Sequence, residues 1–395
     1  MTLSEIASLD EKYYMNTFGK RLPVAFERGE GTKLYATDGR VFNDFLGGIA
    51  VNALGHSHPK FVAALKAQAE KLLHTSSLYY IENQARLAQE LVERTCADRA
   101  FFCSTGAEAN EGALKLAKIY FYKRGLDKYE VISLDNSFHG RTLATVAATG
   151  QEKYQKPYRP NVPGFSQVEP NNFAALEARV TDKTAAIILE PIQGEGGVHP
   201  LDIEYLKKVR QLCDERDIVL IFDEVQTGMG RCGELFCYMT TGVEPDIFTA
   251  AKALGGGVPI GALLAKEKFA DAFAPGDHGT TFGGNPFATA AGLAVLKIFD
   301  EEKLVENSHS MGEYFKKALG GISSDKIAEI RGRGLLIGIE LADGYGKKAF
   351  DALFEKGYLT SLCGGKTLRL APPLIINKEE IDGFVGALDE VLREL

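Results

Sequence analysis

The sequence contains no tryptophan, and it lacks several features that would assign it to a simple class. No apolar run approaches the length of a membrane span, and the first residues do not show the basic and then apolar arrangement of a signal peptide. With 45 Lys and Arg against 53 Asp and Glu, the net charge is −8, which argues against a general nucleic-acid-binding protein. We therefore expect a cytoplasmic protein that binds neither membranes nor nucleic acids.

Cysteine is also scarce, with six residues scattered along 395 positions and no CxxC spacing. This pattern favours reduced thiols over disulfides or a zinc site. His56 and His58, considered without their neighbours, have the spacing of two metal ligands. Because Pro59 follows them, they are better explained as a turn that precedes a helix. We expect no bound metal.

Short apolar runs alternate with helical patterns from about residue 60 to 290. The runs are almost continuously apolar, which is typical of strands covered by helices on both faces. This alternation predicts an α/β domain with a mostly parallel central sheet. The predicted strands span residues 100–103, 131–134, 185–189, 218–222, 246–249 and 262–265, and helices are predicted at 173–179 and 202–216.

The pattern changes after Pro286. A helix is predicted at about 287–301, and strand-like runs at 335–341 and 367–370 lie among helices, which indicates a smaller α+β domain. The first 55 residues contain short strands and glycine turns, and we expect them to pack with the C-terminal part. The predicted divisions are an N-terminal segment (1–58), a large α/β domain (59–290) and a C-terminal small domain (291–395).

Two segments place polar groups directly after predicted strands. In the first, Thr105 and Glu108 form a capping-box pattern, and Gly106 and Ala107 leave the first helical turn open, so its free N–H groups could hold a phosphate. A plain strand-to-helix turn explains the same residues. In the second, Asp223 and Glu224 end a buried strand, where open α/β sheets bind ligands.

A buried carboxylate needs a cationic or hydrogen-bonding partner. A protonated pyridine nitrogen would serve as one for Asp223, which would in turn keep that ring able to accept electrons. A metal is the alternative partner, but no nearby histidine or third carboxylate completes a ligand set.

Lys252 stands between alanines and leads into Gly255, Gly256 and Gly257. Poorly solvating neighbours favour the neutral amine that Schiff-base chemistry requires, and the glycines would allow a planar ring to approach closely. The simpler interpretation of this segment is a lysine that begins a helix beside a loop. No Ser or Thr follows the lysine, so the segment is not a Walker loop.

Two arginines lie at positions where they could bind a substrate carboxylate. Arg141 follows the strand predicted at 131–134, and Arg369 lies inside an apolar strand, where its planar fork suits a carboxylate. An internal salt bridge is the commoner explanation for each arginine alone. Phe138 is either core or a ring that stacks on a planar cofactor.

Together these motifs resemble those of the class III (ω-amino acid) aminotransferases of pyridoxal-phosphate (PLP) fold type I. The resemblance covers nearly the whole chain, with the motifs in the expected order. It rests on six segments: 104–110, 138–142, 190–197, 222–228, 252–257 and 279–286.

The resemblance implies a role for each site residue. Lys252 binds PLP as a Schiff base and moves the substrate proton, and Asp223 pairs with the pyridine nitrogen. Further cofactor-binding residues are Gly106 and Ala107 at the phosphate, Phe138 and Val225 on the two faces of the ring, Gln226 near its hydroxyl, and Thr281 from the other subunit of a homodimer. The substrate-binding residues are Arg141, Glu195, Thr280 and Arg369. Ala107 stands where the family usually has threonine, so the resemblance implies one side-chain contact to the phosphate fewer than usual.

Within the family the chain is most similar to the acetylornithine aminotransferases, a resemblance carried by residues 47–56. Ile49 stands where ornithine aminotransferases tend to have tyrosine, and an apolar residue suits an acylated amine better. The implied reaction is a ping-pong transamination between N-acetylornithine and 2-oxoglutarate, with amino and 2-oxo acids as the only partners besides the second subunit. Ornithine, succinylornithine, succinyldiaminopimelate and 4-aminobutyrate remain alternative substrates, because acyl or methylene differences change affinity only modestly.

Two alternatives belong to other classes of protein. A nicotinamide dehydrogenase would suit the sheet, but Gly332-x-Gly334 is followed by Ile337 where the dinucleotide fingerprint needs a third glycine. A regulatory protein that has lost catalysis on the same fold is the other alternative, and the presence of both Lys252 and Asp223 argues against it.

Overall fold

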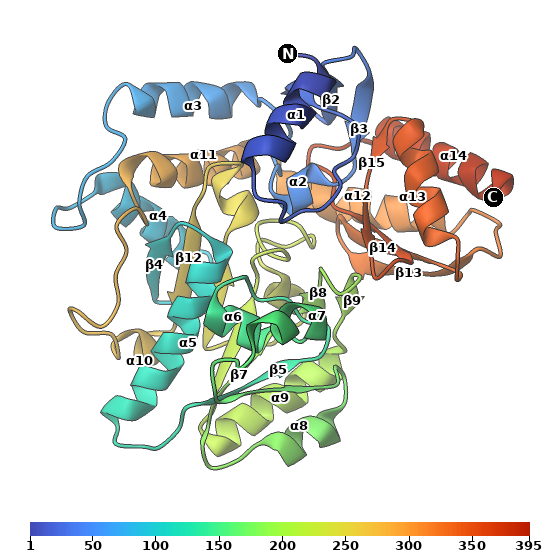
Figure 1. Cartoon of the computed structure of the whole chain (residues 1–395). Helices are drawn as coiled ribbons and strands as arrows, with labels where there is room; N and C mark the ends of the chain where they lie inside the picture. Colours follow the sequence, from blue (N-terminus) through green and yellow to red (C-terminus); the bar gives the residue numbers. More distant parts are fainter.

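The computed structural model describes residues 1 to 395 and contains one large sheet with helices on both faces, beside smaller sheets built from the two ends of the chain (Figure 1). The large sheet has seven strands in the order β4, β12, β11, β10, β7, β5, β6. Their bounds are β4 (Arg99–Cys103), β12 (Gly261–Ala265), β11 (Ile247–Ala250), β10 (Val219–Asp223), β7 (Thr184–Leu189), β5 (Glu130–Leu134) and β6 (Phe165–Val168). Strand β12 is antiparallel to both neighbours and the other pairings are parallel, so the prediction of a mostly parallel sheet is confirmed.

Both faces of this sheet are covered, as the continuous apolar runs predict. On β10, Leu220 and Phe222 enter the main core cluster, whereas Val219 and Ile221 enter a second cluster with helix α5 (Gly106–Lys123). Because successive side chains of a strand point to opposite faces, a strand covered twice needs an apolar residue at every position.

The helices connect the strands and pack on the sheets. Their bounds are α1 (Leu3–Tyr13), α2 (Gly47–Ala50), α3 (Pro59–Ala69), α4 (Glu82–Val92), α6 (Leu143–Ala148), α7 (Glu152–Gln155), α8 (Phe173–Arg179), α9 (Ile203–Arg216), α10 (Glu267–Ala270), α11 (Pro286–Glu302), α12 (Leu304–Leu319), α13 (Gly346–Glu355) and α14 (Lys378–Glu394), with short 3₁₀ turns η1 (Lys156–Tyr158), η2 (Cys237–Thr240) and η3 (Lys252–Gly255). No helix combines the length and the apolar character that crossing a membrane requires.

All six strands predicted in the large domain agree with the structure to within one residue at each end, and the helix predicted at 173–179 coincides with α8. Strand β6 was not predicted. It lies at the sheet edge and carries Ser166 and Gln167 between two apolar residues, so it lacks the apolar run of a doubly covered strand. The reversed direction of β12 was not predicted either, because an apolar run carries no information on strand direction.

Segments from both ends of the chain share one small sheet. Its strands are β1 (Phe26–Glu30), β2 (Lys33–Ala36), β3 (Val41–Asp44) and β15 (Tyr358–Leu359), and β15 pairs directly with β3. A second sheet contains β13 (Ile327–Arg333), β14 (Leu336–Leu341), β17 (Thr367–Leu370) and β16 (Ser361–Cys363) in that order, and a hairpin joins β8 (Ile192–Gln193) to β9 (His199–Pro200). The strands predicted at 335–341 and 367–370 are confirmed. The domain boundaries at 58 and 290 stay predictions, and helix α11 runs across the second of them.

The two possible metal-binding histidines lie in a turn, as expected. His58 directly precedes α3, which has Pro59 in its first turn, and His56 is bonded to Asp44 at 2.8 Å. No group of three or more His, Cys, Asp or Glu is placed to hold a metal ion. All six cysteines are free thiols, and five of them are buried.

Aromatic rings join the N-terminal segment to the C-terminal helices. Phe45 stacks on Phe384 of α14 with ring centroids 4.5 Å apart, and Phe315 of α12 and Tyr358 of β15 meet both rings edge-on. Phe45, Phe315 and Phe384 are almost fully buried. This cluster therefore fixes the segment that leads into α2 against β15 and the C-terminal helices α12 and α14.

Replacing Phe384 by alanine should lower the free energy of unfolding by about 3–5 kcal/mol, because the cavity removes contacts to both ends of the chain. Urea unfolding followed by circular dichroism measures the change. Tyr122→Ala is the control, since Tyr122 is 79% exposed, and it should change stability by less than about 0.5 kcal/mol. Equal losses in the two variants would contradict a cluster that joins the two ends.

Candidate active site

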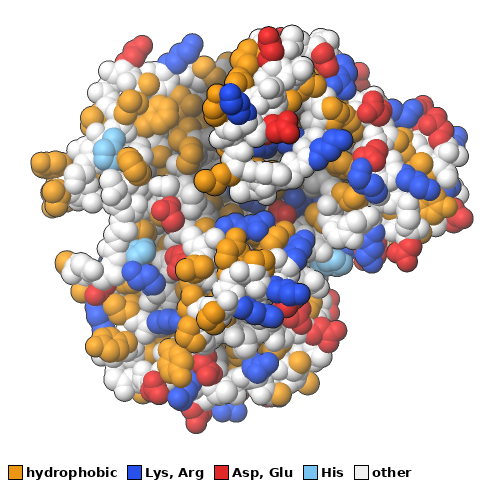
Figure 2. All heavy atoms as spheres, viewed as in Figure 1, with side chains coloured by type: hydrophobic (Ala, Val, Ile, Leu, Met, Phe, Trp, Pro, Cys, Tyr) orange, Lys and Arg blue, Asp and Glu red, His pale blue; other side chains and the backbone are white.

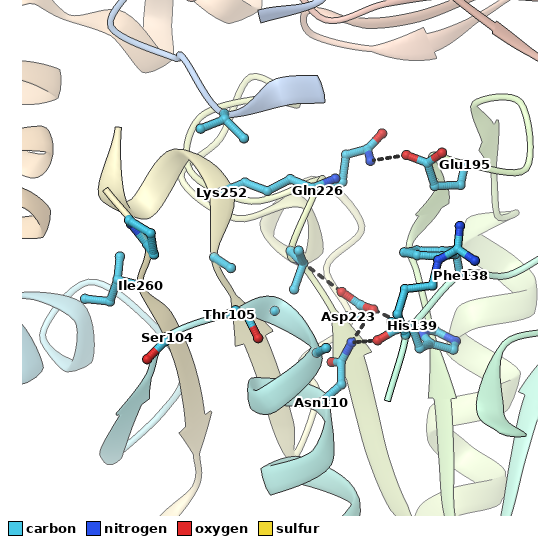
Figure 3. A pocket seen from close by; sticks show the side chains of 18 of the residues that line it. Ser104, Thr105, Asn110, Phe138, His139, Glu195, Asp223, Gln226, Lys252 and Ile260 are labelled. Atoms are coloured by element: carbon cyan, nitrogen blue, oxygen red, sulfur yellow. Dashed lines mark hydrogen bonds and ion pairs between the residues drawn. The ribbon is translucent and has the colours of Figure 1, made fainter. Parts of the chain in front are cut away.

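A cavity of about 470 Å³ opens at the carboxyl ends of the parallel strands. Open α/β sheets bind ligands at this edge. The cavity brings together nine of the twelve predicted site residues: Gly106, Ala107, Phe138, Arg141, Glu195, Asp223, Val225, Gln226 and Lys252. Figure 3 shows how the side chains converge from the ends of several strands.

The carboxylate of Asp223 forms the floor of the cavity and is 4% exposed. Its Oδ2 accepts from Asn110 Nδ2 at 2.7 Å and is bonded to His139 Nδ1 at 2.9 Å, and its Oδ1 accepts from the Val225 N–H at 3.0 Å (Figure 3). Thr249 on β11 donates to Asn110 Oδ1 and so fixes the amide. The carboxylate therefore has one orientation, held by α5, by the segment after β5 and by the turn that follows β10 itself.

Lys252 follows β11, and its backbone has a φ of +46°, in the left-handed region. Its side chain extends across the cavity on the same side as Gln226 and Glu195 (Figure 3). Burial, which penalises the charged ammonium, lowers the pKa of Lys252 to about 8, although the Glu195 carboxylate acts in the opposite direction. About a tenth of this amine is therefore neutral at pH 7, far more than for an ordinary lysine.

The N-terminus of α5 borders the cavity opposite Lys252. Thr105 caps the helix by accepting from the Glu108 N–H at 3.2 Å, but the Glu108 carboxylate accepts from the Ser104 N–H, so only half of the predicted capping box forms. The N–H groups of Gly106 and Ala107 are in the first turn, where no intrahelical acceptor exists. A Cβ added at Gly106 would lie 2.7 Å from Val225, so the site needs glycine there.

Arg369 belongs to a second group of charges beside the cavity. Its Nη1 donates to Glu195 at 2.5 Å and to Gln226 at 3.0 Å, and its Nε donates to Ser361 at 3.0 Å. Burial alone would raise the pKa of Glu195, but the charge and hydrogen bond of Arg369 hold that pKa below its usual range. A substrate carboxylate that reaches Arg369 would have to displace the Glu195 carboxylate.

Arg141 differs from Arg369, because it is exposed and makes no ion pair within the chain. Its guanidinium lies 4.0 Å from the centre of the Tyr154 ring and 5.5 Å from that of Phe138. The arginine is thus held at the cavity rim by aromatic rings and is free to bind an anion.

Two predicted residues, Thr280 and Thr281, are absent from the cavity lining of their own chain. Thr281 is exposed, and the Thr280 hydroxyl accepts from the Gly283 N–H at 3.1 Å. Glu224 also turns away from the cavity: it accepts from Thr227 and from the N–H groups of Cys237 and Tyr238, and its burial raises its pKa to about 7.

Sequence reasoning gave no role to Asn110, His139 or Glu190, although all three line the cavity. Glu190 accepts from the N–H groups of Phe138 and Gly194, and burial raises its pKa to about 7. A signal existed for Asn110, since it is a polar residue on the otherwise apolar buried face of α5. The three residues have different sequence neighbourhoods, and only the fold brings them to Asp223.

Comparison with known proteins agrees with this geometry. The model of the family described as aminotransferase class-III matches residues 14–392. The acetylornithine aminotransferase of Methanocaldococcus jannaschii is 51% identical over 394 residues, covering 98% of each chain.

Two solved structures have the same fold over almost the whole chain. The ornithine aminotransferase of Toxoplasma gondii, whose structure has partial occupancy of PLP at the active site, is 33% identical with a TM-score of 0.95, covering 100% of this chain and 94% of that one. The N-acetylornithine aminotransferase of Stenotrophomonas maltophilia is 37% identical with a TM-score of 0.84, covering 98% of each chain. Since the family match extends over nearly all of the sequence, the chain belongs to the class III aminotransferases.

Proposed function

We propose that this aminotransferase uses PLP to exchange an amino group between N-acetylornithine and 2-oxoglutarate, giving N-acetylglutamate 5-semialdehyde and glutamate, as a step of arginine biosynthesis in the cytoplasm. The observation that carries the proposal is the buried pair formed by Lys252, whose pKa is about 8, and the oriented Asp223 carboxylate, on opposite sides of one cavity. The full-length similarity to acetylornithine aminotransferases supports this substrate. A nicotinamide dehydrogenase is excluded by the family to which the chain belongs.

The residues around the cavity fit the cofactor. A planar ring would lie between Phe138 and Val225, with the Asp223 carboxylate facing its nitrogen and Gln226 near its hydroxyl. Its phosphate would meet the open first turn of α5 at Gly106 and Ala107, where the absent Cβ leaves room. The alanine provides no hydroxyl there, so one side-chain contact to the phosphate is missing.

The chain's own residues position the substrate and move its proton. PLP, when bound, supplies an electron sink for negative charge that develops beside the substrate nitrogen. Lys252 would hold the cofactor and, when released from it, transfer the proton at the substrate carbon that bears the amino group. A pKa near 8 is suited to this role, because the amine can both accept and donate a proton near neutral pH.

The two arginines would bind the carboxylates at the two ends of the substrates. Arg141, unpaired at the rim, would bind a carboxylate of acetylornithine, and Arg369 would bind the α-carboxylate of glutamate after Glu195 has moved away. Thr280 would lie near the substrate as well. Each charge-assisted contact would contribute about 1.5–3 kcal/mol, and holding the substrate at both ends orients the reacting bond.

Replacing Lys252 by alanine should abolish turnover and remove the visible absorbance of lysine-bound PLP, because no other amine enters the cavity. Absorption spectra and assays with acetylornithine and 2-oxoglutarate measure both effects. Lys297→Ala is the control, since that side chain is 76% exposed, and it should keep full activity. Near-normal transamination by the Lys252 variant would refute the assignment.

Ile49 is proposed to favour the acylated substrate over free ornithine. It is 42% exposed on the turn of α2, where it has a φ of +64°, and Val51 two residues later lines the cavity. An apolar side chain offers no hydrogen bond to a free ammonium group, so an unacylated amine would be poorly solvated beside it.

Ile49→Tyr should therefore raise the ratio of kcat/KM for ornithine to that for acetylornithine by about tenfold or more, because the hydroxyl can bond the free amine. Steady-state assays of the two substrates, with succinyldiaminopimelate and 4-aminobutyrate added to the panel, give the ratios. Ile49→Val, which keeps an apolar β-branched side chain, should leave the ratio unchanged. A wild-type enzyme that clearly prefers ornithine would contradict the role of Ile49.

A homodimer with shared active sites is the proposed assembly. Thr281 is followed by Phe282, which is 64% exposed and lies 5.5 Å from the His74 ring. The segment between α3 and α4, which contains His74, also carries Leu78 and Tyr80, 86% and 108% exposed, and hydrophobic side chains lie at the edge of the molecule where this segment projects (Figure 1, Figure 2). An exposed apolar face of this kind is typical of a protein interface, and it would place Thr281 of the partner subunit at the phosphate.

Hybrid dimers test this sharing. Thr281→Asp should be inactive, because a second negative charge would repel the phosphate, and Lys252→Ala should be inactive for its own reason. In a hybrid of the two variants, one site carries both changes and the other carries neither, so mixing the inactive proteins after mild unfolding should restore up to about a quarter of wild-type activity. Hybrids without any activity would show that Thr281 acts within its own subunit.

A further inference from the structure

Four residues form a row across the sheet of β13, β14, β17 and β16, which is called the C-terminal sheet below. Arg331 on β13 lies opposite Gly338 on β14, Gly338 lies opposite Arg369 on β17, and Arg369 lies opposite Ser361 on β16. Residues directly opposite one another on antiparallel strands project from the same face of the sheet. Two guanidinium groups therefore stand on one face of the sheet with a glycine between them.

Arg331 is 7% exposed, and its guanidinium binds the turn between β8 and β9. Its Nε donates to the carbonyls of Gly197 and Val198 at 3.1 and 3.0 Å, and its Nη2 donates to Gly197 at 2.8 Å. Val198 has a φ of +58°, which a β-branched residue rarely adopts. The turn is thus held in a strained shape by bonds from outside it.

The other N–H groups of Arg331 fix its direction. Nη1 donates to Glu329 at 2.7 Å and to Glu340 at 2.6 Å, and Nη2 donates to the Thr367 hydroxyl at 3.1 Å. Two carboxylates therefore balance the buried charge and leave the remaining edge of the guanidinium directed at the turn.

Gly338 allows the turn to rest on the sheet. A Cβ at this position would lie 2.9 Å from Val198 Cβ and 3.1 Å from the Gly197 carbonyl oxygen. The close approach brings the turn beside Arg369, the next residue of the row, and Glu195 of the same turn is bonded to that arginine.

We propose that Arg331 is a positioning residue that holds Glu195 against Arg369. It binds the backbone two and three residues after Glu195 and is not part of the cavity lining. This inference rests on the proposed function, in which Glu195 covers Arg369 while acetylornithine reacts and leaves it when glutamate binds. Losing the Arg331 bonds would release the turn and uncover Arg369, so the half-reaction with acetylornithine would suffer more than the half-reaction with glutamate.

Single-turnover measurement of the two half-reactions in the PLP-loaded enzyme tests this asymmetry. Arg331→Met should lower the ratio of kcat/KM for acetylornithine to that for glutamate by about tenfold, within the range found for coupled neighbours. The matched control is Arg333→Met, on the same strand two residues later, where Nη1 donates to Thr240 at 2.7 Å and does not touch the turn. That control should leave the ratio unchanged. Equal losses in both half-reactions of the Arg331 variant would overturn the proposal.

A double variant separates positioning from general destabilisation. If Arg331 acts through Glu195, adding Arg331→Met to Glu195→Gln should not change the ratio beyond the effect of Glu195→Gln alone. If the double variant instead changed the ratio by the product of the two single-variant factors, the two residues would act independently and the proposal would be overturned.

Arg331→Lys is a second variant that tests the proposal if Arg331→Met does not fold. Lysine keeps a positive charge beside Glu340 but lacks the planar fork that bonds two carbonyls, so the ratio should still fall. Hydrogen exchange of the amides at 197–199 should be faster in this variant and unchanged in Arg333→Met, and equal exchange would overturn the proposal. This readout needs no activity, so an enzyme inactive with both substrates would refute the proposed function and leave the role of Arg331 to be decided by exchange.

Discussion

The site depends on one buried carboxylate. Asp223 ends the central strand β10, and its two oxygens are bonded by Asn110 from α5, by His139 from the segment after β5, and by the N–H of Val225. A carboxylate this deeply buried is tolerable only with such partners, and each partner in turn fixes one wall of the cavity. The bonds that stabilise the charge therefore also set the distance between α5, β5 and β10.

Burial also shifts the pKa values of other ionisable groups around the cavity. It lowers the pKa of Lys252 to about 8 and raises that of Glu190 to about 7, because in both cases it disfavours the charged form. Glu195 escapes this effect, since Arg369 keeps it ionised. One cavity thus holds a partly neutral amine beside a fixed ion pair, which is the combination needed by an enzyme that must move a proton and also recognise carboxylates.

The two smaller sheets contribute to the site without containing its central residues. The aromatic cluster around Phe384 joins the segment leading into α2 to the C-terminal helices. The row from Arg331 to Ser361 places Arg369 next to the turn that contains Glu195, beside the cavity. Segments from the N-terminal and the C-terminal parts of the sequence therefore lie together beside the cavity, at the carboxyl ends of the strands of the large sheet. A displacement of the C-terminal sheet would move Arg369 and the Glu195 turn together, because both are attached to it.

The sequence alone determined the alternating frame, since strands covered on both faces must be apolar at every position, and six of them were located to within one residue. It also predicted site positions such as Lys252, Asp223 and Arg369, because a charged residue in an apolar setting must have a charged or hydrogen-bonding partner. Only the tertiary structure decided how these positions are used. The edge strand β6 and the reversed β12 depend on pairing between distant segments, which no local pattern encodes. The supporting roles of Asn110, His139 and Arg331 likewise exist only where segments far apart in sequence come within hydrogen-bonding distance.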